Sequence, residues 1–190
     1  VVELDYKALH PSLLAEAEGH TLPANFDPYG IEVEGYSREV LRKIAKLAML
    51  IMINTEADTP KKAVQRAASA LNKEISGMVS EDGERLPDVW FDIGEIPSRV
   101  IDVKLIMEKL TIHNNYISEY FYSGEGIRLQ NIDSRIMDYI LTYFGQKGEA
   151  AIPVHDSVIV RESLEKELYE IMKEAYHVVM GSSNNCVITK

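Results

Sequence analysis

Apolar runs rich in β-branched residues lie near both ends of the chain. Residues 1–4 read VVEL, and residues 152–160 read IPVHDSVIV, in which two apolar runs meet at a His-Asp-Ser corner. Runs of this kind are typical of strands, and polar residues between two of them indicate a hairpin turn. The closing residues, CVITK, predict a further short strand. We therefore expect strands at both ends of the chain.

The middle of the chain has helical spacing instead. From Ser37, a candidate N-cap, apolar residues recur every three or four positions, at Val40, Leu41, Ile44, Leu47, Ala48 and Ile51. Further helices are expected over residues 10–18, from Thr59-Pro60 to about 75, from a cap at Ser98 to about 120, over about 131–144 with a stop at Gly145, and from Ser163 to Gly181. Residues 77–97, rich in Gly, Pro and acidic residues, are typical of a long connection.

Strands at both ends around a helical middle predict an α+β fold. We expect a small antiparallel sheet built from both chain ends, with a helical insertion between them. The expected parts are residues 1–25 and 126–190, which carry the sheet, and residues 26–125, which form the insertion. A length of 190 residues and a hydrophobic content of 46% suit such a body.

The composition bears on the compartment of the protein and on its contacts with membranes and nucleic acid. No apolar run approaches the roughly 20 residues of a membrane span, and there is no secretory leader, so we expect no membrane contact. The single Cys186 fits a reducing compartment, and we expect a cytoplasmic protein of bacterial, phage or mobile-element context. A net charge of -10 argues against coating nucleic acid by bulk electrostatics, although it leaves room for a local basic groove.

Two aspartates fall where the predicted sheet can bring them together. Asp5 stands at the end of the first strand, and Asp156 stands at the tip of the hairpin. Two carboxylates a few Å apart repel, so such a pair normally needs a cation, and hard oxygen ligands suit Mg²⁺. Two such ions can activate an attacking hydroxyl and stabilise the leaving oxygen in phosphoryl transfer. An aspartate at a turn is also common without any catalytic role.

A basic face on the helix after Ser37 adds the second half of a nucleotide site. Arg38, Arg42 and Lys46 are spaced four apart and share one face. A guanidinium and an ammonium one turn apart can hold a triphosphate, although basic pairs at this spacing are more often solvated. Together with the two aspartates, they supply the parts needed to bind and cleave a nucleoside triphosphate.

Three blocks of the chain resemble the motifs of a known enzyme group, in its order. VVELDYKALHPSLL, RKIAKLAMLIMINT and VHDSVIV resemble motifs A, B and C of single-subunit nucleic-acid polymerases. This group holds the polymerase I (family A) DNA polymerases and the single-subunit bacteriophage RNA polymerases. The resemblance implies a palm formed by residues 1–25 and 126–190 and helical fingers formed by residues 26–125.

The resemblance also implies roles for individual residues. Asp5, the main-chain carbonyl of Tyr6 and Asp156 would bind two Mg²⁺ ions, or Mn²⁺ in their place. The other implied roles are nucleotide binding by Arg42, Lys46, His10 and Asn54, catalysis by Lys46 beside the two aspartates, and primer or template contact by Gln130 and His155. His10 falls at the position that contacts the sugar and favours deoxynucleotides.

The chain departs from the family pattern at three points. Asn54-Thr55 stands where motif B continues to a Tyr-Gly pair, and Leu50 stands where DNA enzymes often carry an aromatic residue. The serine after Asp156 is not a departure, because it is similar to the serine of the phage RNA polymerases. The thumb of the family precedes motif A, so we expect a thumb-bearing N-terminal region or a second chain to complete the enzyme.

The expected function is therefore a DNA-polymerase-like nucleotidyltransferase that extends a primer on a nucleic-acid template from nucleoside triphosphates. An RNA polymerase or primase activity is one alternative. A polymerase-fold module that binds nucleic acid or protein without chemistry is another, favoured by the missing Tyr-Gly pair and the acidic charge. A metal phosphodiesterase is a third alternative, and it would want more carboxylates and histidines near the metals.

Overall fold

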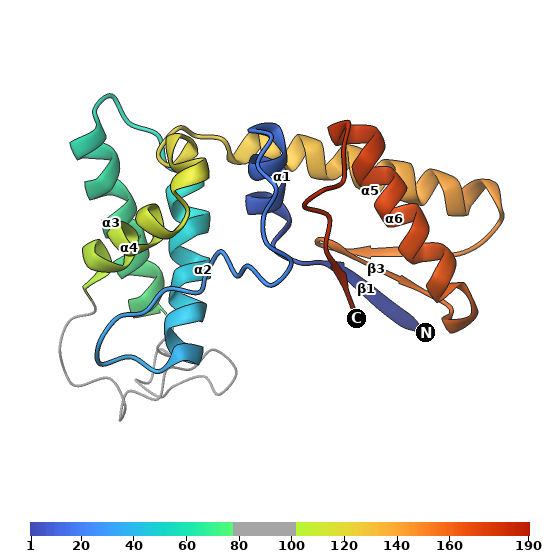
Figure 1. The fold of residues 1–190 in the computed structure, drawn as a ribbon, viewed down its shortest axis with the longest axis horizontal. Helices are drawn as coiled ribbons and strands as arrows, with labels where there is room; N and C mark the ends of the chain where they lie inside the picture. The colour runs from blue at the N-terminus through green and yellow to red at the C-terminus, as the bar shows by residue number, and fades with distance from the viewer. Residues whose placement is uncertain (78–101) are drawn as a thin grey trace. The chain divides into compact units, whose positions relative to one another are not determined.

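The computed structural model describes residues 1–77 and 102–190, and the chain forms two compact units (Figure 1). Unit 1 combines Val1–Asn25 with Ile127–Lys190, and unit 2 is Phe26–Gly126. The connection expected over residues 77–97 and the cap expected at Ser98 lie outside the described residues, except for Gly77. No helix in the described part of the chain combines the length and the apolar character needed to cross a membrane.

Unit 1 contains a four-stranded sheet in the order β2-β3-β1-β4. Its strands are β1 (Val2–Tyr6), β2 (Ile152–Val154), β3 (Ser157–Val160) and β4 (Ile188–Thr189). All three neighbouring pairs are antiparallel, and the two strands of the predicted hairpin are β2 and β3. The expected α+β fold, with a small antiparallel sheet made from both chain ends, is confirmed.

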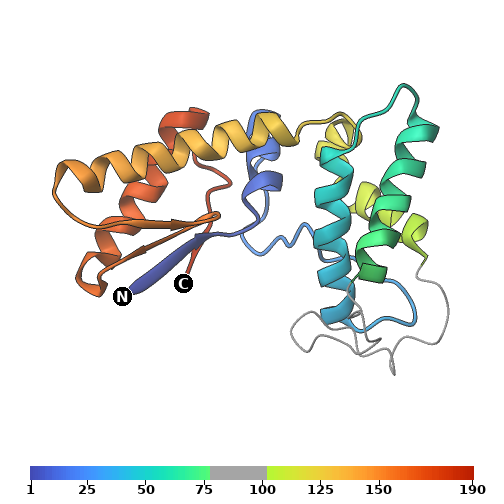
Figure 2. The same ribbon diagram turned by 180° about the vertical axis from the view of Figure 1, so that it is seen from behind.

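The two faces of the sheet differ in burial because side chains alternate along a strand. Val2, Leu4 and Tyr6 of β1 are buried, whereas Glu3 and Asp5 point to the opposite face. Figures 1 and 2 show the two long helices of unit 1 on one side of the sheet. The helices of this unit are α1 (Leu9–Ala17), α5 (Gly126–Gln146), η3 (Glu162–Leu164, a 3₁₀ helix) and α6 (Glu165–Met180).

Helix α5 is longer than the helix expected over residues 131–144. It begins at Gly126 and continues past Gly145, where the sequence indicated a stop. Gly148, with a φ of 70°, takes the left-handed conformation that closes a helix, and its N–H donates to the carbonyl of Gly145 (3.0 Å). The expected end at Gly145 is therefore wrong, because glycine at that position keeps the helical backbone.

The end of the chain is fastened to α1 by a buried carboxylate. Glu16 accepts hydrogen bonds from the main-chain N–H groups of Asn184 (3.2 Å) and Asn185 (2.8 Å) and contacts the hydroxyl of Ser182. Asn185 is also buried, and its side chain bonds to Leu22 N–H (2.8 Å) and to the carbonyl of His20 (2.6 Å). These contacts fix the segment that leads into β4 beside β1.

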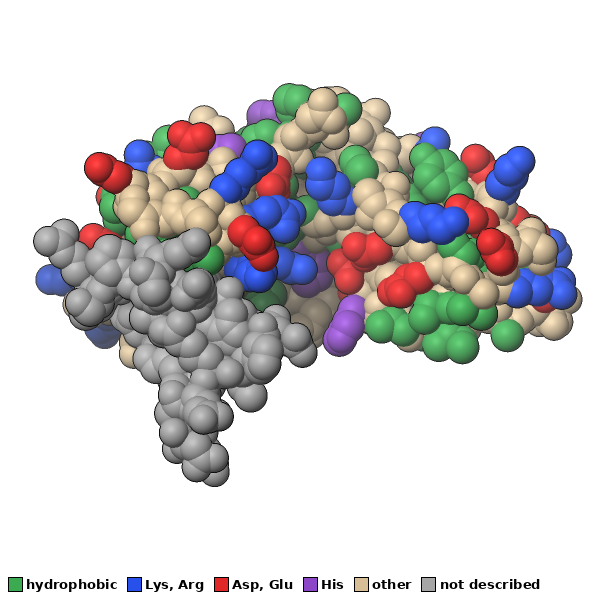
Figure 3. Space-filling view, turned by 90° about the horizontal axis from the view of Figure 1, so that it is seen from below, with side chains coloured by type: hydrophobic (Ala, Val, Ile, Leu, Met, Phe, Trp, Pro, Cys, Tyr) green, Lys and Arg blue, Asp and Glu red, His purple; other side chains and the backbone are tan. Residues whose placement is uncertain are grey.

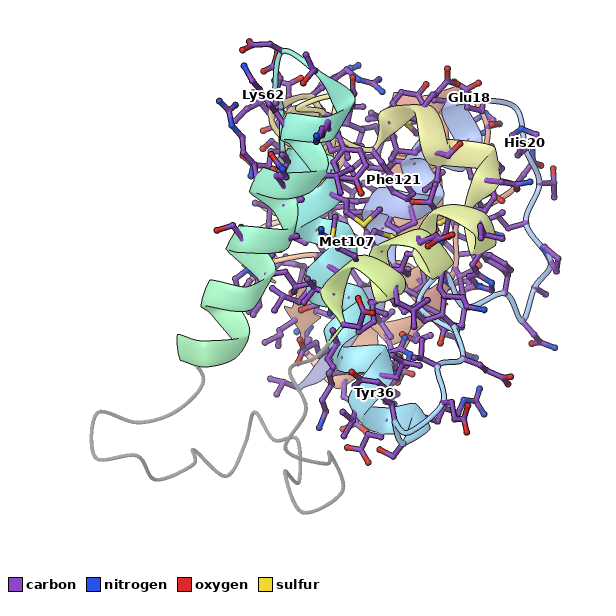
Figure 4. All side chains as sticks on the ribbon, turned by 90° about the vertical axis from the view of Figure 1, so that its left-hand side faces the viewer. Glu18, His20, Tyr36, Lys62, Met107 and Phe121 are labelled. Atoms are coloured by element: carbon purple, nitrogen blue, oxygen red, sulfur yellow. The ribbon has the colours of Figure 1, made fainter. Side chains whose placement is uncertain are left out.

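Unit 2 is helical. Its helices are α2 (Arg38–Asn54), α3 (Pro60–Gly77), α4 (Val103–His113) and η2 (Asn115–Tyr120, a 3₁₀ helix). Met107 and Phe121 are buried inside this unit, whereas Lys62 lies on the outer surface of α3 (Figure 4). The unit thus has its own hydrophobic core.

The helix boundaries in unit 2 agree with the sequence at the start of α2 and differ at the end of α4. The hydroxyl of Ser37 accepts from Val40 N–H (3.3 Å), so the predicted N-cap of α2 is confirmed. The N-cap of α4 is Asp102, whose carboxylate accepts from Leu105 N–H (3.0 Å). This helix ends at His113, so the expected extension to about 120 is wrong: the buried Asn114 leaves helical geometry and a 3₁₀ helix follows.

Candidate active site

The two aspartates singled out from the sequence line one hollow of about 420 Å³ on unit 1. Asp5 lies within β1, one residue before its end, and pairs with Ser157 of β3 and Thr189 of β4. The main-chain carbonyl of Asp156 accepts a hydrogen bond from Tyr6 N–H (3.2 Å). The sheet therefore holds together two carboxylate-bearing residues from opposite ends of the chain.

The surface around this hollow is both acidic and apolar. Figure 3 looks onto the sheet side of unit 1 and shows acidic side chains beside a hydrophobic patch. Ile152 and Val154 of β2 are exposed. The complete lining of the hollow is Glu3, Asp5, Val154, His155, Asp156, Ser157, Thr189 and Lys190.

The hairpin tip has an unusual backbone. His155 has a φ of 55°, a left-handed value that residues other than glycine seldom adopt. Its side chain is exposed, whereas Ser157 beyond the tip is buried, with its hydroxyl near the Val154 carbonyl (2.9 Å) and the Glu3 carboxylate. Such backbone strain is often found at functional sites. The turn thereby presents Asp156 between an exposed histidine and a buried serine.

The charge of Asp156 influences the pKa of a histidine and of a third aspartate. Burial lowers the pKa of His10, and the Asp156 carboxylate partly opposes this effect. Burial, with a further contribution from Asp156, raises the pKa of Asp133 on α5 to about 6. His10 was expected near the site, whereas Asp133 was missed. In the sequence, Asp133 is simply an acidic residue in an amphipathic helix, and such residues are also typical of a solvated helix face.

The basic residues expected to hold phosphate lie on α2 of unit 2. Arg38, Arg42 and Lys46 are all exposed. Arg42 is ion-paired with Asp27 (Nε to Oδ2, 2.7 Å), and its guanidinium lies over the Tyr29 ring at 5.3 Å from the centroid. Arg38 and Arg42 also line a hollow of about 740 Å³ formed with the loop before α2.

Two further residues expected to contact substrate also belong to exposed surfaces. The Asn54 amide donates to the carbonyl of Leu50 (2.7 Å), one turn earlier on α2. Asn54 also lies so close to Gly126 that a Cβ at that glycine would fall 1.6 Å from its Oδ1. Gln130 is exposed on α5. Asn54 therefore has a structural contact in addition to its expected role.

In the described residues, no group of three or more His, Cys, Asp or Glu side chains could hold a metal ion. Asp5 and Asp156 are two side chains, one fewer than the smallest group of this kind. Carboxylates that share a hollow can bind a hard cation, and exposed cations on a helix can bind phosphate.

The chain matches no protein-family model, no curated protein and no solved structure.

Proposed function

We propose that this protein is a template-directed nucleotidyltransferase of the DNA-polymerase type, which adds nucleotides to the 3′ end of a primer. The observation that supports this most is the meeting of Asp5 and Asp156 in one hollow. Both aspartates lie off the buried face of the sheet, so their side chains are not part of the core of unit 1. Two nearby carboxylates in that place suit cation-dependent chemistry on phosphates.

The residues around this hollow fit Mg²⁺, or Mn²⁺ in its place. Asp5 and Asp156 offer hard oxygen donors, and the main-chain carbonyl of Tyr6 is a third oxygen next to Asp5. The ammonium of Lys190, which also lines the hollow, is engaged by the Glu165 carboxylate (2.9 Å) and so does not neutralise the pair alone. Two bound ions would activate the primer hydroxyl and stabilise the leaving oxygen.

The triphosphate is assigned to α2 of unit 2. Lys46 and Arg42 are exposed, one turn apart, and can bind anionic oxygens in the ground state. The ammonium of Lys46 would also offset the negative charge that develops on the leaving pyrophosphate.

His10 is assigned to the sugar. Its lowered pKa keeps the imidazole neutral near pH 7, where it can pack against a sugar ring without a charge to solvate. A flat, bulky ring under the sugar occupies the space that a 2′-hydroxyl would need, so deoxynucleotides are favoured. Ribonucleotide synthesis is the second candidate function, supported by the exposed, non-aromatic Leu50 on α2.

Nucleic acid and a further protein surface are the proposed partners. At a net charge of -10, the chain gains little affinity for a duplex from general phosphate neutralisation. A thumb-bearing region or a second chain would supply the basic surface that retains primer and template. The proposal is tested by primer extension with Mg²⁺, comparing the wild-type chain with variants of the two aspartates.

A further inference from the structure

The loop before α2 holds the side chain of Arg42 by a bidentate contact. Asp27, in the FDPYG stretch, accepts from the Arg42 Nε–H through Oδ2 (2.7 Å) and from Nη2 through Oδ1 (3.3 Å). Two parallel bonds to one carboxylate fix the plane of a guanidinium as well as its distance. Both residues belong to unit 2, so the pair is a local feature of this unit.

The carboxylate of Asp27 is itself held in place by its surroundings. Its Oδ1 accepts from Tyr29 N–H (3.2 Å), and its main-chain carbonyl accepts from Gly30 N–H (2.9 Å) and from the His113 Nε2 (2.9 Å). The buried Asn114 donates to the next carbonyl, that of Pro28 (2.9 Å). The loop is thus tied to the end of α4, and Asp27 offers Arg42 a fixed partner.

The contact leaves part of the guanidinium for a second anion. An arginine has five N–H donors, and Asp27 takes two of them, on the edge formed by Nε and Nη2. The Arg42 side chain is 44% exposed, and the Tyr29 ring lies beneath its guanidinium. The end of the fork, formed by the remaining hydrogens of Nη1 and Nη2, is therefore the part that can receive phosphate oxygens.

We propose that Asp27 is a positioning residue for phosphate binding, which holds Arg42 on Tyr29 so that the end of the guanidinium is preorganised for a triphosphate. The inference rests on the proposed function, because it deepens the role of the α2 basic face. A side chain held in its binding geometry loses less freedom when the ligand arrives, which raises affinity. The opposite role, a carboxylate that competes with phosphate for Arg42, predicts the opposite sign when Asp27 is neutralised.

Binding of inorganic tripolyphosphate separates these roles without requiring chemistry. Isothermal titration calorimetry would compare the wild-type chain, Asp27→Asn, Arg42→Lys and the double variant, in buffer without divalent cations. Asparagine keeps an acceptor for Tyr29 N–H but loses the charge that holds Arg42. We expect Asp27→Asn to weaken binding about 5- to 10-fold, and to have no further effect once Arg42 is lysine.

Glu39→Gln is the matched control. Glu39 is an acidic residue whose carboxylate pairs with a neighbouring cation of α2, Lys43, at 2.9 Å, and it has no contact with Arg42 among the described residues. The control should bind tripolyphosphate as the wild type does, and thermal melting should show that all variants are folded. Binding by Asp27→Asn at or above the wild-type affinity would overturn the inference, as would a wild type that binds no tripolyphosphate.

A parallel primer-extension assay keeps the two proposals distinguishable. If the wild type extends no primer while the binding pattern appears as expected, the proposed function fails and the positioning role of Asp27 stands. If extension occurs but Asp27→Asn leaves both tripolyphosphate affinity and the KM for nucleotide unchanged, the positioning role is overturned and the proposed function stands. With both correct, Asp27→Asn raises KM more than it lowers kcat.

Discussion

The main-chain N–H of Tyr6 donates a hydrogen bond to the main-chain carbonyl of Asp156 across 3.2 Å. The residue that follows Asp5 is thereby tied to the tip of the β2–β3 hairpin. This tether and the pairing of Asp5 with Ser157 are made by the backbone, so they do not depend on either aspartate side chain. Charge at the hollow can therefore be removed with little effect on the sheet.

Substitution of Lys46 tests the triphosphate assignment. Lys46→Ala should lower kcat/KM for nucleotide about 10- to 100-fold, because the ammonium would contact phosphate in both ground and transition states. Steady-state primer extension over a range of nucleotide concentrations provides the measurement. Lys43→Ala is the control, since Lys43 is also an exposed lysine of α2 but pairs with Glu39. Equal kcat/KM values for the two variants would assign Lys46 to an ordinary solvated face.

Substitution of His10 tests the sugar assignment. His10→Ala should raise ribonucleotide incorporation relative to deoxynucleotide incorporation by about 10-fold, because the space for a 2′-hydroxyl is opened. His10→Phe keeps a flat ring in place and should retain the wild-type preference. A wild type that already prefers ribonucleotides, with a ratio unaffected by His10→Ala, would favour the RNA-synthesis alternative.

The pKa of Asp133 predicts a pH-dependent stability. This pKa is raised in the folded state from 3.8 to about 6, first by burial and then by Asp156. The folded state therefore binds the proton more tightly, and the associated stability is present below pH 3.8 and lost as the pH rises through about 6. Asp133→Asn should exceed the wild type in free energy of unfolding by about 1 to 2 kcal/mol at pH 8, a value reduced for partial exposure.

Denaturant unfolding from pH 3.5 to 8 measures this difference. The gap between wild type and Asp133→Asn should open between pH 4 and 7 and be small below pH 4. Asp138→Asn, which removes an exposed carboxylate from the same helix, should follow the wild-type curve. Parallel curves for Asp133→Asn and the wild type would show that the carboxyl is not perturbed.

Much of the fold could be predicted from local sequence signals. The strands at both ends, the hairpin at His155-Asp156 and the cap at Ser37 each depend on neighbouring residues, and all are present. The wrong predictions concern helix ends, because several neighbouring residues there carry signals that could end the helix. Gly145 gave a stop signal as good as that of Gly148, and only the three-dimensional structure shows which one leaves the helical conformation.

Of the candidate site, only the residues with a local sequence signal could be predicted. Asp5 and Asp156 stood out because their places on predicted strands allowed them to meet. The Asp27–Arg42 pair, the contacts of Glu16 with the C-terminal segment and the proximity of Asp133 to Asp156 depend on tertiary packing. No local pattern marks the members of such contacts, because each alone is typical of a polar surface residue.

The close approach of Gly126 and Asn54 predicts a steric effect on stability. Gly126→Ala would place a Cβ 1.6 Å from the Asn54 Oδ1, so one side chain must move. We expect a loss of about 1 to 3 kcal/mol in the free energy of unfolding, measured by denaturant titration. Combining Gly126→Ala with Asn54→Ala should recover most of the loss. If the double variant is no more stable than Gly126→Ala alone, the clash with Asn54 is not the cause.

The most direct test of the account is primer extension by the wild type, Asp5→Ala and Asp156→Ala in Mg²⁺, with Asp138→Asn as the control. We predict that the wild type and the control extend the primer, while each hollow variant loses at least about 1,000-fold in rate, because its remaining carboxylate cannot hold the ions. All four proteins should melt cooperatively at similar temperatures. Extension by Asp156→Ala at the wild-type rate, or no extension by the wild type, would contradict the proposed nucleotidyltransferase.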